Sequence, residues 1–239
     1  MRRSTRYLTI IVAIQLLVMG AASAATITGT VKFDGEVPKK LRPIAMDADP
    51  ECAKKHSGPV PSEMLVLGDG NTMANIFVTI TKGLPDKAWP APKAPVVLDQ
   101  KGCQYIPHVT GIMVNQPMRI LNSDGILHNV HSLSKVNKSF NIAMPASRTE
   151  TLETFTQTEG MFVIKCDIHP WMKAFIQVMP HPFFDVTGKD GKFTIKDLPA
   201  GTYEVEIWHE KLGTKSASVT VGADETKTAD FALSPPKKK

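Results

Sequence analysis

Short runs of β-branched residues, or of alternating apolar and polar residues, recur along the chain between turn-forming residues. Apolar positions that repeat every second residue are typical of strands, and the dipeptide Asp190-Gly191 is a hairpin-turn signal. We expect strands at residues 27–33, 75–81, 95–98, 111–121, 161–166, 174–178, 192–195, 203–208, 216–221 and 226–233. Helical signal is confined to residues 49–56, where Asp49 is the expected N-cap. Many short strands without a long helix predict an all-β fold of the sandwich or barrel class.

Two proline clusters interrupt this pattern, at residues 89–95 and 179–182. Because proline cannot continue a central strand, both clusters are candidate domain boundaries. They enclose a segment of roughly 85 residues, which is enough for one β-sandwich. We therefore expect a separate domain at residues 93–180 that folds on its own.

The first residues have the pattern of an export signal. Three arginines without an acidic residue precede an apolar run at residues 8–19, and small residues then end in an A-x-A site at Ala24. The alternative is an uncleaved anchor helix, but the apolar run is shorter than the roughly 20 residues that a membrane span needs. We expect residues 1–24 to be a cleaved signal peptide and the mature protein to be periplasmic or secreted, without a membrane span.

The net charge of +5 comes from the two ends of the chain. Arg2, Arg3 and Arg6 lie in the signal segment, and three lysines lie in a basic tail at residues 235–239. Without these six residues, 22 of the 28 Lys and Arg remain to face 23 Asp and Glu. The body of the chain is near neutral, so we expect no nucleic-acid partner.

The three cysteines form an odd number in a chain predicted to reach an oxidising compartment. Cys52 and Cys103 are the natural disulfide pair, because Cys166 has metal-ligand neighbours that the other two lack. The alternative is three unpaired buried thiols.

Candidate metal ligands gather between the two proline clusters. The segment 124–131 contains His128, and the segment 165–172 contains Cys166, His169 and Met172. A thiolate, two imidazoles and a thioether are the ligand set of a copper site with a weak axial methionine. Zinc is an alternative, although thioether is a poor zinc ligand. The remaining alternative is a buried thiol among histidines of the core or surface.

The spacing lets one short loop supply most of these ligands. Cys166 ends a predicted strand, and His169 and Met172 lie in the turn before the next strand begins. His128 arrives from a separate strand. His131 is expected on the opposite face of that strand as a surface or packing residue. Whether His108, His131 or His209 forms a second metal site is left open by the sequence.

Residues 93–180 resemble the cupredoxins, the blue-copper electron carriers such as amicyanin and plastocyanin. The resemblance rests on H-N-V-H at 128–131 and C-x-x-H-x-x-M at 166–172. It implies a Greek-key β-sandwich with copper as cofactor. It further implies His128, Cys166 and His169 as equatorial ligands and Met172 as the axial ligand. Asn129 would link the two ligand loops through hydrogen bonds, and Pro170 would stiffen the ligand loop.

The segments on either side resemble a carboxypeptidase-regulatory-like β-sandwich. The resemblance rests on residues 27–31, 75–80, 190–195 and 198–205. It implies that residues 25–92 and 181–234 form one discontinuous, smaller β-sandwich into which the cupredoxin domain is inserted. The competing layout is three consecutive domains, but residues 25–92 alone have too few strands to bury a core. We assign no chemistry to this second sandwich.

The leading functional interpretation is an exported electron carrier, in which copper cycles between Cu(I) and Cu(II) and an exposed His169 ring passes the electron. The expected partner is a redox protein of the cytochrome or dehydrogenase type. Lys165 and Lys173 flank the ligand loop and Trp171 lies within it, so we expect the partner to have an acidic rim around an apolar patch. The alternative is a periplasmic copper-binding protein for storage, delivery or sensing.

An enzyme is not expected. A laccase-like multicopper oxidase needs more histidines than the seven present. Copper nitrite reductases place a histidine of a second copper site beside the cysteine ligand, whereas Cys166 is flanked by Lys165 and Asp167.

Overall fold

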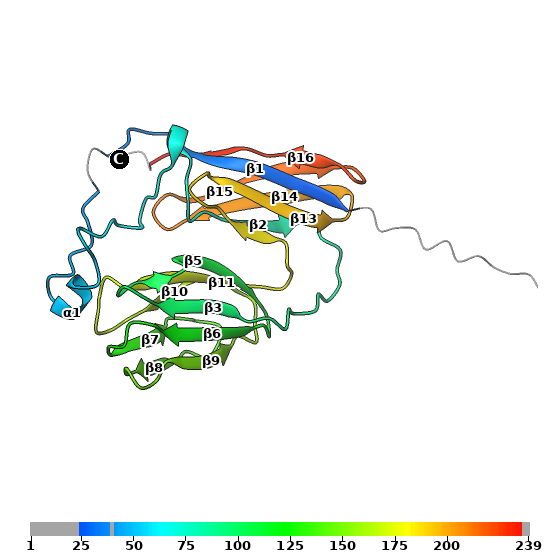
Figure 1. Cartoon of the computed structure of the whole chain (residues 1–239). Coiled ribbons are helices and arrows are strands. Elements are labelled where there is room, and N and C mark those ends of the chain that lie inside the picture. The colour runs from blue at the N-terminus through cyan, green and yellow to red at the C-terminus, as the bar shows by residue number, and fades with distance from the viewer. Residues whose placement is uncertain (1–23, 39–40, 236–239) are drawn as a thin grey trace, which may run out of the picture.

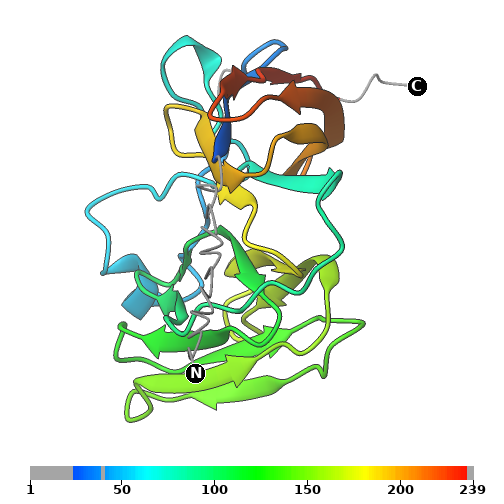
Figure 2. The ribbon, with the colours of Figure 1, turned by 90° about the vertical axis from the view of Figure 1, so that its right-hand side faces the viewer.

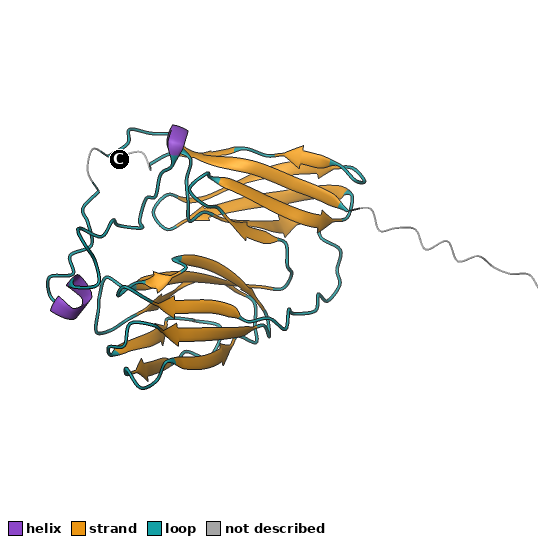
Figure 3. Cartoon of the chain, viewed as in Figure 1, coloured by secondary structure: helices purple, strands orange, loops and turns teal. Residues whose placement is uncertain are grey.

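The computed structural model describes residues 24–38 and 41–235 (Figure 1). Strands and loops make up nearly all of this part of the chain, as Figure 3 shows, so the predicted all-β fold is confirmed. The two helical elements there are α1 (Pro50–Ala53) and a single 3-10 turn, η1 (Asp69–Asn71). The predicted signal peptide and basic tail lie almost entirely outside the described residues.

Strands from both ends of the described chain form one sandwich of two four-stranded sheets. The first sheet has the order β13-β1-β16, with β17 also paired to β1; its strands are β1 (Ala25–Phe33), β13 (Lys192–Leu198), β16 (Thr226–Thr228) and β17 (Phe231–Leu233). The second has the order β12-β2-β14-β15; its strands are β2 (Phe77–Lys82), β12 (Phe184–Val186), β14 (Gly201–His209) and β15 (Gly213–Val221). Alternate side chains of β1 are buried, as expected for a strand that covers a core with one face.

The intervening strands form two further sheets, drawn in green to yellow in the lower half of Figure 1. One has the order β5-β11-β10-β7-β8; its strands are β5 (Val109–Met113), β7 (His128–Ser132), β8 (Asn141–Met144), β10 (Glu159–Lys165) and β11 (Lys173–Met179). The other has the order β4-β3-β6-β9; its strands are β3 (Val96–Gln100), β4 (Tyr105–Ile106), β6 (Pro117–Asn122) and β9 (Glu150–Thr154). The domain boundaries at the proline clusters remain a prediction.

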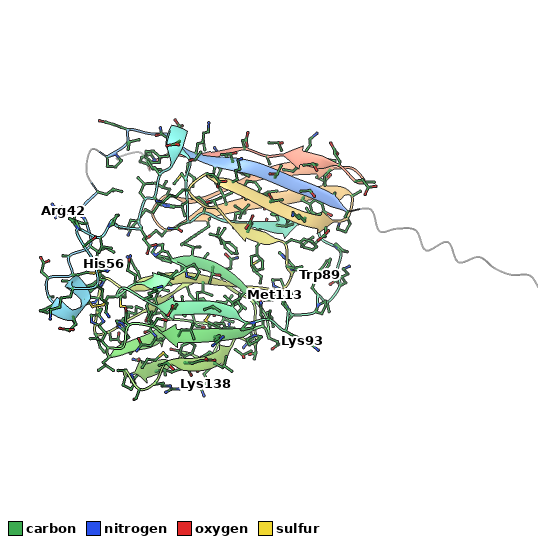
Figure 4. All side chains as sticks on the ribbon, in the orientation of Figure 1. Arg42, His56, Trp89, Lys93, Met113 and Lys138 are labelled. Carbon is green, nitrogen blue, oxygen red and sulfur yellow. A yellow bond between two sulfur atoms is a disulfide. The ribbon has the colours of Figure 1, made fainter. Side chains whose placement is uncertain are left out.

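A third apolar cluster joins the two sandwiches, which lie one above the other in Figures 1 and 2. Phe77 of the outer sandwich is buried with Val109, Phe175 and Met179 of the inserted one. Side chains fill the space between the two pairs of sheets (Figure 4). We therefore expect the two sandwiches to be held together by burial of apolar surface.

The segment at residues 41–64 leaves the outer sandwich and packs on the inserted one. Met46, Cys52 and Val60 are buried in the same apolar cluster as the inserted strands. The Ile44 N–H donates to the Val60 carbonyl at 2.8 Å, which closes the segment into a loop around α1. An isolated segment 93–180 therefore lacks three side chains of the core around which its own strands pack.

The predicted strand at residues 111–121 is interrupted. β5 ends at Met113 and β6 begins at Pro117. Asn115 between them has φ of 64°, and the Gln116 side chain accepts a hydrogen bond from the Met113 N–H at 3.0 Å. Asparagine tolerates this left-handed backbone better than most residues, and the resulting turn lets β5 and β6 enter different sheets.

A buried carboxylate organises the turn that follows β7. Glu159, 7% exposed, accepts hydrogen bonds from the Ser134 hydroxyl at 2.5 Å and the Lys135 N–H at 2.6 Å. The Asn137 N–H donates to it at 3.2 Å. Burial acts to raise the pKa of Glu159, but these hydrogen bonds outweigh it and lower the pKa to about 2. The carboxylate thus stabilises the fold fully above its unfolded pKa of about 4.3, and this contribution is lost as the pH falls toward 2.

The Glu159→Gln variant is expected to lose about 2–3 kcal/mol of unfolding free energy at pH 7, because the neutral amide cannot replace an ionised acceptor. The difference in unfolding free energy between the variant and the natural protein should be smaller at pH 3, because part of the stabilisation by the Glu159 carboxylate is lost below its unfolded pKa. Urea unfolding at both pH values measures this. The control is Glu150→Gln, since Glu150 forms an exposed pair with Arg119 at 2.8 Å and should contribute less than about 1 kcal/mol. Equal losses for the two variants would contradict the assignment.

Candidate metal centre

Three of the four sequence-predicted ligands meet at one end of the inserted sandwich. His128 is the first residue of β7, Cys166 directly follows β10, and His169 lies in the turn before β11. β7 and β10 are antiparallel neighbours, with His131 opposite Lys165, so the two ligand loops lie together. One ligand atom from each of the three side chains lies within 4.8 Å of the others. Each of the three residues is at most 1% exposed.

The two imidazole rings are held from outside by carboxylates. His128 Nε2 lies 2.9 Å from Asp124 Oδ2, and His169 Nε2 lies 2.9 Å from Asp49 Oδ2. An ionised carboxylate only accepts hydrogen bonds, so each Nε2 carries a proton and each Nδ1 is turned inward, toward the other ring. The two Nδ1 atoms are 2.9 Å apart, and Cys166 Sγ is 3.6 Å from Nδ1 of His169. Three atoms that can bind a metal ion, two imidazole nitrogens and one sulfur, therefore converge on one point.

The Cys166 sulfur has thiolate character near neutral pH. Burial acts to raise the pKa of Cys166, but hydrogen bonding to the His128 ring and to backbone N–H groups outweighs it and lowers the pKa to about 6. One of these donors is the His169 N–H, at 3.4 Å from Sγ. Since the thiolate is the form that binds metal, the sulfur is prepared as a ligand near neutral pH.

The backbone closes the ligand loop tightly. The Met172 N–H donates to the His169 carbonyl at 2.9 Å, and the Cys166 N–H donates to the Met172 carbonyl at 3.1 Å. Met172 is 1% exposed and belongs to the same apolar cluster as Cys166. The Trp171 Nε1–H donates to the Cys103 carbonyl at 3.0 Å, which fixes the loop to the disulfide-bearing turn.

Asn129 joins the two ligand loops. Its Oδ1 accepts from the Asp167 N–H at 2.7 Å and lies 3.3 Å from Cys166 Sγ. Its Nδ2 donates to Asn141 at 2.6 Å and to the Asp167 carboxylate at 3.1 Å. The same carboxylate bonds His131 Nδ1 at 2.9 Å, so His131 faces away from the three ligand atoms.

The prediction of an exposed His169 ring is wrong. The segment at residues 41–64 covers the site, and Asp49 occupies the Nε2 edge that the cupredoxin resemblance left open to solvent. The Cys52–Cys103 disulfide ties this segment to the turn before β4. Sequence reasoning identified Asp49 as the helix cap, and the structure shows this function as well, but no local pattern places it beside a residue that follows 120 positions later.

Among the described residues, the other histidines belong to no group of three metal-ligating side chains. His108 Nε2 bonds Glu210 at 2.8 Å, where the two sandwiches meet. Within residues 24–38 and 41–235, two further groups of three metal-ligating side chains occur, and both contain a sulfur of the Cys52–Cys103 disulfide. Neither includes His108, His131 or His209.

The donor set fits copper. Thiolate, imidazole and thioether ligands favour copper among the biological metals. Bonds of about 2.0–2.3 Å to nitrogen and sulfur place all ligands of one ion within about 4.6 Å of one another. The separations of 2.9 Å between the two Nδ1 atoms and 3.6 Å between Cys166 Sγ and His169 Nδ1 fall within that limit. His128, Cys166 and His169 can therefore hold a metal ion, with Met172 in the same loop.

The comparisons with known proteins give one family match and several similar solved structures. Residues 180–234 match the family model of the carboxypeptidase regulatory-like domain. No curated protein matches the chain. Solved structures similar to it include a variant of oxidized amicyanin, at 23% identity and a TM-score of 0.33, covering 43% of this chain and 98% of amicyanin.

Two further similar structures are also copper proteins or cupredoxins by name. A copper-containing nitrite reductase from Thermus scotoductus SA-01 is 23% identical with a TM-score of 0.34; 41% of this chain and 25% of the reductase are covered. A purple cupredoxin from Nitrosopumilus maritimus is 21% identical with a TM-score of 0.30, over 35% of this chain and 99% of that one. The chain thus spans a quarter of the reductase but nearly the whole of the small cupredoxins.

Among the described residues, no helix has the length and apolar character needed to cross a membrane.

Proposed function

We propose that this chain is an exported type 1 copper protein that carries electrons. The observation that carries the proposal is the convergence of His128 Nδ1, His169 Nδ1 and Cys166 Sγ in a buried site. Copper bound there supplies a one-electron couple between Cu(I) and Cu(II).

The surrounding hydrogen bonds suit such a carrier. Asn129 holds the two ligand loops at a fixed separation, and the Met172 backbone closes the ligand loop on both sides. Ligands that are fixed by the fold keep the same positions in both oxidation states, so little of the protein has to rearrange when an electron is transferred. The burial of all three ligand side chains also supports a non-enzymatic role, because no substrate can reach the metal position directly.

Because His169 is buried, we propose that electrons enter and leave the protein through Trp171. The Trp171 ring centroid is 5.3 Å from that of His169, and the Trp171 side chain is half-buried. Trp171 lines a cavity of about 490 Å³ together with apolar residues such as Pro43 and Met64. We propose that a redox partner of the cytochrome or dehydrogenase type contacts this face.

The flanking lysines give this face little net positive charge. Lys165 Nζ lies 2.7 Å from Asp167, and Lys173 Nζ lies 3.9 Å from Glu210. Because both lysines face carboxylates, we propose that the partner contact is mainly apolar around Trp171, rather than one steered by an acidic rim.

The decisive experiment separates an electron carrier from a copper donor. The mature protein is loaded with Cu(II), reduced with ascorbate in the presence of a Cu(I) chelator of moderate affinity, and reoxidised. We expect an intense visible thiolate-to-copper band that returns over repeated cycles, because the buried ligands retain copper in both states. Rapid and complete transfer of Cu(I) to the chelator at neutral pH would overturn the carrier and favour the storage or delivery alternative.

A further inference from the structure

Residues 41–64, which we call the cover, shield the metal centre from solvent. Asp49 of this segment also bonds the His169 ring. Asp49 is the N-cap of α1, and its two carboxylate oxygens have different partners. Oδ1 accepts hydrogen bonds from the Glu51 N–H at 2.9 Å and the Cys52 N–H at 3.3 Å. Oδ2 lies 2.9 Å from His169 Nε2. One oxygen therefore fixes the carboxylate to the helix while the other fixes the ring.

The carboxylate on the other imidazole is fixed in the same way. Asp124, which bonds His128 Nε2, accepts hydrogen bonds from the Gly102 N–H at 2.7 Å and the Cys103 N–H at 2.8 Å. The backbone of one disulfide cysteine thus positions the partner of His169, and the backbone of the other positions the partner of His128. The Cys52–Cys103 bond joins these two supports covalently.

Two side chains of the cover add further contacts to the same turn. Lys55 Nζ donates to the Asp124 carbonyl at 2.7 Å, and His56 Nε2 bonds the Gly102 carbonyl at 2.8 Å. The cover is therefore attached to the inserted sandwich on both sides of the disulfide.

We propose that Asp49 is a positioning residue of the metal centre, supplied by the segment that covers it. Asp49 keeps His169 in the tautomer with a free Nδ1 and holds that nitrogen toward Cys166 and His128. With the disulfide, it also keeps water away from the ligand atoms. The inference concerns the copper centre proposed above, but its geometric part can be tested without copper.

The test compares Asp49→Asn, Asp49→Ala and the control Glu51→Gln in the full mature chain. Asparagine caps helices as well as aspartate does, so Asp49→Asn keeps α1 and removes the charge that fixes the ring. Glu51 lies on the same helix and pairs with exposed Lys54 at 2.7 Å, away from the metal centre. Peptide mapping without reduction verifies that the disulfide is present in every variant.

Two measurements use the metal-free protein. The ¹⁵N chemical shifts of the His169 ring should show a protonated Nε2 and a free Nδ1 in the natural protein and the control, and a mixture of tautomers in Asp49→Asn. The alkylation rate of Cys166 by iodoacetamide should rise in Asp49→Ala by about tenfold or more, because the variant opens a path for water and reagent. Unchanged shifts and unchanged alkylation in both Asp49 variants would overturn the proposal.

A third measurement uses the copper-loaded protein. Loss of a partner that orients a histidine ligand typically costs about 10–100-fold in metal affinity. We expect that range for Cu(I) in Asp49→Asn and Asp49→Ala, and no change in Glu51→Gln. If the Cu(I) affinity of the control Glu51→Gln falls as much as that of the Asp49 variants, residues 41–64 act only through general stability. The assignment of Asp49 as a positioning residue is then wrong. If no variant binds copper but the two metal-free results hold, the proposed copper function fails while the position of Asp49 stands.

Discussion

The Cys166→Ala variant is expected to lose the visible band of the copper-loaded protein and to bind copper more than about 100-fold more weakly. Loss of a residue that only orients a metal ligand costs up to about 100-fold in metal affinity. Cys166 is itself a proposed ligand, so its loss should cost more. Cys166 is 1% exposed, and its pKa of about 6 makes the sulfur an anionic donor near neutral pH. Competition titration with a copper chelator, followed by visible absorption, measures both effects.

The matched control for this variant is His131→Ala. His131 lies on β7 close to the ligands, but its ring bonds the Asp167 carboxylate instead of facing the metal position. The control should keep the band, and thermal unfolding should show that both variants are folded. A colourless natural protein, or a band that survives in Cys166→Ala, would contradict the assignment of the thiolate.

Replacement of Cys52 and Cys103 together by alanine is expected to lower the free energy of unfolding by about 4 kcal/mol. The disulfide closes a loop with a sequence separation of 51, and the loop-entropy relation gives about 4 kcal/mol for that length. Both alanines are compatible with the buried positions, and the double change leaves no unpaired thiol from the pair. Urea unfolding of the oxidised natural protein and the variant measures the difference.

The same double variant should also weaken the cover over His169, because the disulfide anchors the segment that carries Asp49. We expect faster alkylation of Cys166 in native conditions than in the natural protein. A loss below about 1 kcal/mol together with unchanged alkylation would show that the cover is held by its other contacts alone.

The ligand set could be predicted from the sequence because its spacing is local. Cys166, His169 and Met172 lie within one turn between two strands, and the short loop leaves few ways to place them. His128 was recognised from its own short motif, and its strand is a neighbour of the strand before Cys166. The all-β class followed from the many short runs with a period of two, since that period depends on neighbouring residues only.

Some strands could not be predicted because their patterns are short or weak. β4 has two residues and β12 has three, and β9 alternates between half-exposed and exposed side chains without a buried face. These strands exist because a neighbouring strand offers hydrogen-bonding partners, as β6 does for β9. That pairing is a property of the folded sheet and leaves little trace in the local sequence.

The sequence by itself therefore determined the strand-rich class, the three side chains His128, Cys166 and His169 that the structure brings together, and the identity of the paired cysteines. Only the tertiary structure decided that Asp49 holds His169, that residues 41–64 cover the site, and that an apolar cluster around Phe77 and Phe175 joins the sandwiches. The physical reason is distance along the chain. Strand periodicity and loop spacing act between residues a few positions apart, whereas the contact from Asp49 to His169 spans 120 positions and forms only when residues 41–64 pack on the folded inserted sandwich.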